Sequence, residues 1–170
     1  MRGFTLFDLL VTVALAAIVA GLALPMLHAS VLNAQRRDAL NAWMSSVYLA
    51  RHTAIRRLLP VVICPATPSP CETPADWNSG WIVFINADGD VPPQLDAGET
   101  ILRQEPPRPR ITLHSNRAAF RFHRVGLRST NGTVTVCDSR GSEAARTIII
   151  SYTGRPRIAT TMANGDTINC

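Results

Sequence analysis

The N-terminal part of the chain is a long uncharged run that follows a short basic start. Residues 9–24 contain no charged side chain. With the preceding residues from Phe4, the stretch reaches about 20 residues, enough to cross a hydrocarbon core as a helix. The acid Asp8 stands near its beginning, and a lone charge in such a segment needs a positively charged partner. The pattern predicts a membrane-spanning helix over residues 4–28 that carries one carboxylate for pairing.

Helical spacing continues beyond this segment. Apolar residues recur at helical intervals as far as Leu58, while arginines and Asp38 occupy other positions. Residues 29–59 are therefore predicted to continue the same helix in amphipathic form, until Pro60 ends it. Pro25 is expected to kink the helix, because proline removes a backbone donor and crowds the preceding turn. The apolar stripe of residues 29–59 requires a sheet to cover it.

From Pro60 onward the pattern changes to short β-rich runs separated by turn residues. The predicted strands cover residues 61–64, 80–85, 100–103, 111–113, 119–123, 133–137 and 147–151. Asn131-Gly132 predicts a tight turn. Strand alternation puts Phe120 and Phe122 on one face, and Arg121 with His123 on the other. The predicted fold is α+β, a long kinked N-terminal helix packed on a mostly antiparallel β-sheet domain over residues 60–170.

The cysteines indicate the cellular compartment in which the domain lies. There are four of them: Cys64, Cys71, Cys137 and Cys170. None forms a C-x-x-C pair and no histidine has zinc-finger spacing, so a metal site is not expected. An even count favours disulfides and an exported domain. Three pairings are possible. Cys64–Cys71, which closes a short proline-rich loop, and Cys137–Cys170, which ties down the C-terminus, are favoured.

The net charge of +5 is unevenly distributed along the chain. Residues 60–102 contain six acidic residues and no arginine, whereas residues 103–170 contain eleven arginines and four acids. Such asymmetry suggests an anionic partner for the C-terminal part. All seventeen basic residues are arginine, whose planar fork suits phosphate oxygens. Codon bias in a GC-rich genome is an alternative reason for the missing lysines, and solvated surface is an alternative role for the arginines of residues 103–128.

The segment Gly154-Arg155-Pro156-Arg157 concentrates charge on a stiff backbone. Glycine permits an unusual turn and proline fixes the next dihedral, so we expect a stiff, extended loop that holds Arg155 and Arg157. Arg140, Arg146 and Arg121 are candidates to join them. Arginine contacts to phosphates would give sequence-independent, salt-sensitive affinity. The alternative is a basic hairpin that contacts a neighbouring subunit or the membrane.

No enzymatic site stands out in the sequence. Residues 86–90 resemble the opening of a calcium loop, but Val91 replaces the expected glycine and Ala97 the expected glutamate, so a solvated hairpin turn is the interpretation here. The four histidines lack ligand spacing, and no Ser/His/Asp or Cys/His arrangement occurs. We expect no catalytic residue, no metal and no cofactor.

The N-terminus resembles that of the type IV pilin family. The matching residues are Gly3, then Phe4-Thr5-Leu6, the acid Asp8 at the fifth place counted from Phe4, and Pro25 at the twenty-second. The resemblance implies that residues 1–3 are a leader removed by prepilin peptidase after Gly3, and that the new Phe4 amine is N-methylated. It also implies that Asp8 neutralises the terminal amine of a neighbouring subunit in the filament. The family usually has glutamate here, and aspartate is one methylene shorter.

A narrower resemblance, to the GspH/FimT branch of minor pilins and pseudopilins, extends along nearly the whole chain. It rests on residues 50–55, 62–64, 77–84, 98–103, 122–126 and 154–157. It implies a single-pass inner-membrane protein with a periplasmic domain that joins other major and minor pilins and reaches the cell surface in a pilus.

In proteins of the FimT type, the Gly-Arg-x-Arg motif implies DNA binding during natural transformation. Two alternatives remain at this stage. One is a priming subunit at the pilus tip with a purely structural role. The other is a minor pseudopilin of a type II secretion system.

Overall fold

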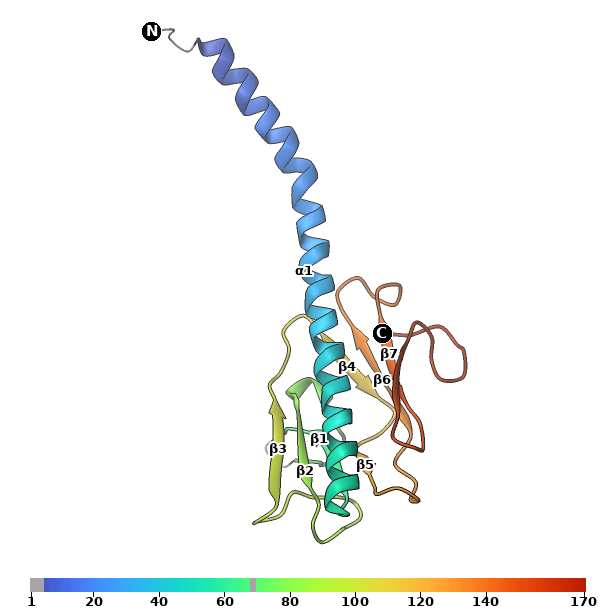
Figure 1. Ribbon diagram of the computed structural model, residues 1–170. Coiled ribbons are helices and arrows are strands. Elements are labelled where there is room, and N and C mark those ends of the chain that lie inside the picture. The colour runs from blue at the N-terminus through green and yellow to red at the C-terminus, as the bar shows by residue number, and fades with distance from the viewer. Residues whose placement is uncertain (1–4, 68–69) are drawn as a thin grey trace. The chain divides into compact units, whose positions relative to one another are not determined.

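The computed structural model of the protein describes residues 5–67 and 70–170. Within these ranges one long helix precedes a series of short strands (Figure 1). The elements are α1 (Leu6–Arg57), β1 (Val61–Pro65), the 3₁₀ turn η1 (Trp77–Ser79), β2 (Trp81–Ile85), β3 (Thr100–Glu105), β4 (Thr112–Ser115), β5 (Phe120–Phe122), β6 (Gly132–Cys137), β7 (Arg146–Ile150) and β8 (Pro156–Ala159). The predicted α+β class is confirmed.

Helix α1 begins at a capping box formed by Thr5 and Asp8. The Asp8 amide donates to Thr5 Oγ1 over 3.2 Å, and the Thr5 amide donates to Asp8 Oδ2 over 3.1 Å. The helix continues through residue 25, where the sequence predicts a kink, and ends at Arg57. Leu58 follows with a φ of 60°, a conformation that terminates helices. The N-terminal part of α1 is long and apolar enough to cross a membrane, in keeping with a single-pass anchor.

The chain divides into two compact units, residues 1–35 and residues 36–170. The boundaries predicted from the sequence, after residues 28 and 59, separate the membrane-spanning, amphipathic and β-rich segments. The second unit contains all the strands named above together with the last part of α1. This part of the helix therefore folds with the sheets, because its buried residues belong to their core. The candidate site described below lies entirely in the second unit.

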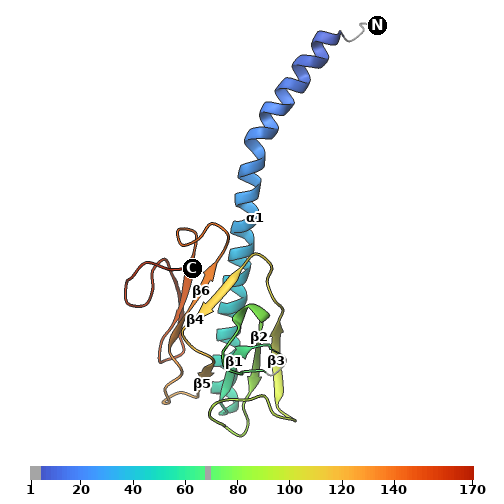
Figure 2. The ribbon, with the colours of Figure 1, turned by 180° about the vertical axis from the view of Figure 1, so that it is seen from behind.

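The strands form two four-stranded antiparallel sheets. One has the order β3-β2-β1-β5 and the other the order β4-β6-β7-β8. The last part of α1 lies across one face of both sheets, as Figure 1 and the reverse view in Figure 2 show. The sequence predicted all of these strands except β8, which pairs with β7 from Ile150–Pro156 to Thr147–Ala159.

Trp43 of α1 is the centre of the core. It is fully buried, and its ring centroid lies 5.2 Å from both Trp77 and Trp81 and 5.8 Å from Phe120. The Trp81 indole donates to Ser46 Oγ on the helix over 3.0 Å. Aromatic packing therefore joins the helix to β2, β5 and η1. Phe122 is buried like Phe120, which confirms the alternation predicted for β5.

Gly80 explains why a glycine precedes Trp81. Its φ is 88°, and a Cβ placed there would lie 2.2 Å from the Glu105 carbonyl oxygen on β3. Only glycine fits both the backbone conformation and the close approach of the neighbouring strand. Residues 77–81 are thus a packing motif, in which Gly80 allows both Trp77 and Trp81 to be buried in the core.

The tight turn predicted at residues 131–132 is not present in the structure. Asn131-Gly132 does not form a tight turn, because Gly132 is the first residue of β6 and pairs with Ile150. A Cβ at this position would come within 3 Å of Phe120 Cε1, Asn116 Oδ1 and Arg117 Cγ. The glycine is needed for close packing between chain segments, which the dipeptide signal does not distinguish from a turn.

Both disulfides have the pairing that the sequence analysis favours. Cys64 is bonded to Cys71 and Cys137 to Cys170, so each bridge joins a strand to the loop or tail that follows. The second bridge holds the C-terminus against β6 across 33 residues. Such cross-links restrict the unfolded chain more strongly as the closed loop grows longer.

Candidate functional site

A concave basic pocket of about 530 Å³ lies in the second unit. Its walls come from α1, from the segment 123–129 between β5 and β6, and from the segment 152–155 between β7 and β8. Four arginines line it: Arg51, Arg124, Arg128 and Arg155. None of the described residues that line this pocket is acidic. The pocket, called the basic pocket below, therefore gathers positive charge from three separate parts of the chain.

The turn between β7 and β8 holds Arg155 in place. The Gly154 amide donates to the Ser151 carbonyl over 2.8 Å, and Gly154 has a φ of 69°. This is a three-residue hairpin loop closed by a left-handed residue, a position that favours glycine. A Cβ on Gly154 would also lie 3.1 Å from Phe122 Cδ1. Arg51 Nε donates to the Thr153 carbonyl over 3.2 Å, so the helix supports the turn from one side.

A second turn, residues 124–127, forms the opposite rim. The Leu127 amide donates to the Arg124 carbonyl over 3.2 Å, and Gly126 takes a φ of 92°. The two turns are tied together, since the Ser129 amide donates to the Tyr152 carbonyl over 2.9 Å. Backbone hydrogen bonds thus hold the arginines of both rims near one another.

The positive charge of the pocket comes from arginines, one of which is held by an aromatic ring. Arg128 Cζ lies 4.3 Å from the Tyr152 ring centroid, a cation–π contact that orients the guanidinium. Burial and the charge of Arg121 lower the pKa of His123 below its ordinary 6.5. The imidazole is therefore neutral near pH 7, and the positive charge of the pocket comes from its arginines.

Arg155 and Arg157 occupy different places, although the sequence grouped them. Arg155 lines the basic pocket, whereas Arg157 lies on β8 opposite Ile149. The predicted extended loop over residues 154–157 is therefore wrong in part, because Pro156 begins a strand. The side chains of both arginines are exposed. Arg157 therefore adds positive charge on the same hairpin, outside the basic pocket.

Arg121 and Arg146 bond to the domain itself. Arg121 Nη2 donates to the Asp90 carbonyl, and Arg146 Nη1 donates to the Ala145 carbonyl over 2.6 Å. Arg146 stands at the start of β7, three residues before Ile149, about 10 Å along the strand at the usual rise. Neither residue lines the basic pocket with Arg155.

Arg140 is engaged by a buried carboxylate. Its Nη2 and Nε donate to Asp138 Oδ2 and Oδ1 over 2.6 and 3.0 Å, and the Asp138 side chain has no exposed surface. The Arg140 guanidinium holds the pKa of Asp138 below its usual 3.8. Arg140 is thus a structural partner in the loop between β6 and β7, apart from the basic pocket.

Asp138→Asn is expected to destabilise the protein by about 1.5–3 kcal/mol at neutral pH, the usual worth of hydrogen bonds to a charged group. The stability from a carboxyl group with a lowered pKa is present above its unfolded pKa and disappears as the pH falls through the folded value. The difference between wild type and variant should therefore shrink between about pH 5 and pH 2. Denaturant unfolding across that range measures it, and a constant difference would contradict the role of the ion pair.

Several other arginines of residues 103–128 support the fold. Arg108 bonds to Asp38 and, over 2.8 Å, to Glu105, and Arg117 Nε donates to the Asn131 carbonyl over 2.8 Å. Sequence reasoning did not select Arg51 or Tyr152 for the site. The approach of Arg51 to Arg155 depends on its contact with the Thr153 carbonyl in the β7–β8 turn, for which the sequence offers no local signal. Tyr152 lies in that same turn, three residues before Arg155.

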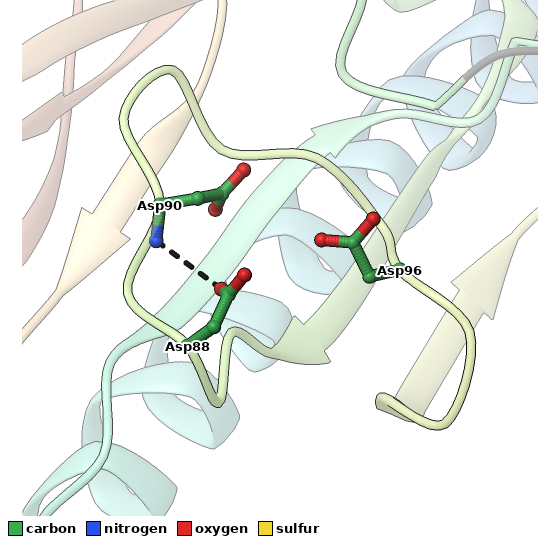
Figure 3. Close-up of side chains that lie close together, drawn as sticks. All are labelled: Asp88, Asp90 and Asp96. Carbon is green, nitrogen blue, oxygen red and sulfur yellow. Dashed lines mark hydrogen bonds between the residues drawn. The ribbon is translucent and has the colours of Figure 1, made fainter.

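Three acidic side chains from the loop between β2 and β3 also lie close together. Figure 3 shows Asp88, Asp90 and Asp96, and one carboxylate oxygen from each lies within 4.8 Å of the other two. Asp90 Oδ1 accepts from Asn86 Nδ2 over 2.7 Å, and Asp90 Oδ2 accepts from the Gln94 amide over 2.8 Å. Through these two hydrogen bonds, the Asp90 carboxylate stabilises the conformation of its own loop.

At the N-terminus, the residues expected to be processed, Gly3 and Phe4, lie outside the described residues. Asp8 is exposed, and its Oδ2 accepts from both the amide and the hydroxyl of Thr5. The carboxylate thus closes the first turn of α1 within its own chain.

Comparisons with known proteins agree with this architecture. The family model of the type II transport protein GspH matches residues 39–154. Two crystal structures of the type IV minor pilin FimU from Pseudomonas aeruginosa share the fold. One superposes with a TM-score of 0.53 at 17% identity, covering 72% of this chain and 91% of FimU. The other gives 0.52 at 18% identity, covering 79% and 92%. Comparison with curated proteins gives no match.

Proposed function

Because the chain belongs to the GspH family of minor pilins and pseudopilins, we propose that it is a minor pilin that captures DNA on a type IV pilus for natural transformation. Members of this family associate with other pilins in a filament, and the apolar start of α1 is compatible with membrane anchoring before assembly. The domain outside the membrane, residues 60–170 with the supporting part of the helix, is then periplasmic and reaches the surface in the filament.

The N-terminus supplies the assembly step of this proposal. Prepilin peptidase cuts after Gly3, the Phe4 amine is methylated, and Asp8 pairs with the corresponding amine of a neighbouring subunit. A carboxylate and an ammonium are tolerated in an apolar environment only when they are paired. The capping box with Thr5 supports this role, since it holds the Asp8 carboxylate at the first turn of the helix.

The main structural support for DNA binding is the basic pocket. Four arginines without an acidic neighbour among the lining residues offer guanidinium groups to phosphates from three chain segments. Such contacts do not read base sequence, which suits a machine that takes up any DNA. Arg157 contacts the next phosphate along the hairpin, while Arg121, Arg140 and Arg146 serve the fold and the surrounding positive potential.

The test compares single arginine variants of the full-length protein in detergent micelles. Arg155→Ala is expected to weaken binding to a fluorescent duplex by about fivefold or more, since a guanidinium–phosphate contact is worth about 1 kcal/mol or more. Arg157→Ala should weaken it less, because Arg157 stands outside the pocket. Fluorescence anisotropy at about 50 mM salt gives both affinities.

Arg110→Asn is the matched control for loss of one positive charge. Arg110 is exposed, lies outside the basic pocket and has a φ of 67°, which asparagine tolerates. This variant should bind DNA within about twofold of wild type. If Arg155→Ala binds as well as the control, the pocket does not hold the phosphates.

A second function, that of a minor pseudopilin in type II secretion, is favoured by the description of the matching family as a type II transport protein. Deleting the gene would then abolish export of folded proteins and leave transformation unchanged. A DNA-capturing minor pilin would instead lose transformation on deletion and leave protein export unchanged. A priming subunit of the pilus tip would instead lose piliation on deletion and show no DNA affinity.

A further inference from the structure

The rim of the basic pocket carries apolar side chains that the fold does not use. Val125 is 73% exposed and Leu127 is 52% exposed, and both project from the tight turn of residues 124–127. Arg124 and Arg128 flank them. Apart from Val125 and Leu127, its two chain neighbours, no atom of the described chain lies within 4 Å of a Cβ placed at Gly126, so the tip of the turn is open to solvent. Below, Val125 and Leu127 are called the apolar tip.

Next to the apolar tip stands a half-exposed aromatic ring. Tyr152 is 50% exposed and lines the same pocket. The guanidinium of Arg128 lies against this ring at 4.3 Å from its centroid. Alternating cationic and apolar groups around a concavity match the composition of a nucleotide, which has an anionic phosphate and a flat apolar base.

A duplex offers phosphates to the arginines of this site but no partner for its apolar groups. A duplex presents phosphates on a convex surface, and its base faces are stacked inside, out of reach of a protein turn. The volume of about 530 Å³ falls within the range of pockets that enclose small molecules. Apolar side chains beside such a pocket can contact the faces of the bases only where the DNA strand is unpaired.

We propose that the basic pocket and the apolar tip bind unpaired DNA, with the arginines on its phosphates and Val125, Leu127 and Tyr152 against its bases. This inference rests on the proposed DNA-binding function and adds its substrate class, single strands and frayed ends. Base contact without hydrogen-bonded readout leaves the binding independent of sequence.

The test uses the full-length protein in detergent micelles and two fluorescent probes. One is a single strand of about 20 nucleotides, longer than the ~4–16-nucleotide sites of single-strand binders, and the other is the duplex of the same sequence. The variant combines Val125→Ser with Leu127→Ser. We expect it to bind the single strand about fivefold or more weakly, because contacts between bases and apolar groups are lost. Binding to the duplex should change by less than about twofold.

A control variant removes two exposed apolar residues elsewhere, by Val91→Ser with Ile101→Ser, and should leave both affinities unchanged. Equal losses for single strand and duplex in the apolar-tip variant would overturn the inference, as would no loss for either. Each of these results leaves the proposed DNA binding intact, because wild type still binds. If wild type binds neither probe, the proposed function itself fails. Circular dichroism on each variant checks that the fold is kept.

Discussion

Trp43→Ala is expected to destabilise the domain by about 3–5 kcal/mol, the usual cost of removing a large aromatic side chain from a core. Trp43 is fully buried and lies within 6 Å of three other aromatic rings, by ring centroids of 5.2, 5.2 and 5.8 Å. These neighbours come from separate elements, so they cannot all close the cavity without breaking their own contacts. Denaturant unfolding of the full-length protein in micelles, followed by tryptophan fluorescence and circular dichroism, measures the loss.

Tyr48→Ala provides the control on the same helix. Tyr48 stands five residues later and is 46% exposed, so its removal should cost less than about 1 kcal/mol. Similar losses for the two variants would mean that the helix does not contribute the centre of this core.

Neutralising three arginines of the basic pocket together is expected to lower DNA affinity by roughly 100-fold. The variant combines Arg51→Gln, Arg124→Gln and Arg155→Gln, and each lost guanidinium–phosphate contact is assigned about 1 kcal/mol. Arg128 is left in place because its stacking on Tyr152 also supports the pocket wall. Anisotropy titration at about 50 mM salt gives the affinity.

A variant with the same net charge separates a specific site from general attraction. Arg56→Gln, Arg57→Gln and Arg110→Asn remove three exposed arginines that do not line the basic pocket. If charge alone attracted DNA, both triple variants would lose affinity equally. The pocket predicts a small loss for this control and a large one for the pocket variant.

The sequence predicted the elements of the fold because their signals are local. The apolar run, the stripe continued to Leu58 and the short β-rich runs each follow from residues near one another in the chain. The turn predicted at Asn131-Gly132 was wrong because the reason for this glycine is not local. A side chain at Gly132 would clash with Phe120 and Asn116, which lie more than ten residues earlier in the chain. Strand β8 was missed because Gly154 and Pro156 have the local signature of a loop.

The site could be predicted only in part. Arg155 stood out through its glycine and proline neighbours, and it does line the basic pocket. Arg51 is more than 100 residues away in sequence, and only the contact with the Thr153 carbonyl brings it near. Arg140 and Arg146 had the right charge, but Asp138 and the Ala145 carbonyl hold them elsewhere. Charge counts do not tell a ligand-binding arginine from one that bonds to its own domain.

The salt dependence of DNA binding tests the central claim most directly. For duplex DNA, log K falls against log salt with a slope of about −0.9 for each phosphate contact. With four arginines on phosphates, the wild-type slope between about 50 and about 200 mM salt should be negative, with a magnitude of about 3.6 or more. The triple pocket variant should lower its magnitude by about 2–3, whereas the triple control should leave it nearly unchanged. Equal slopes for wild type and the pocket variant would contradict the claim that these arginines hold the DNA backbone.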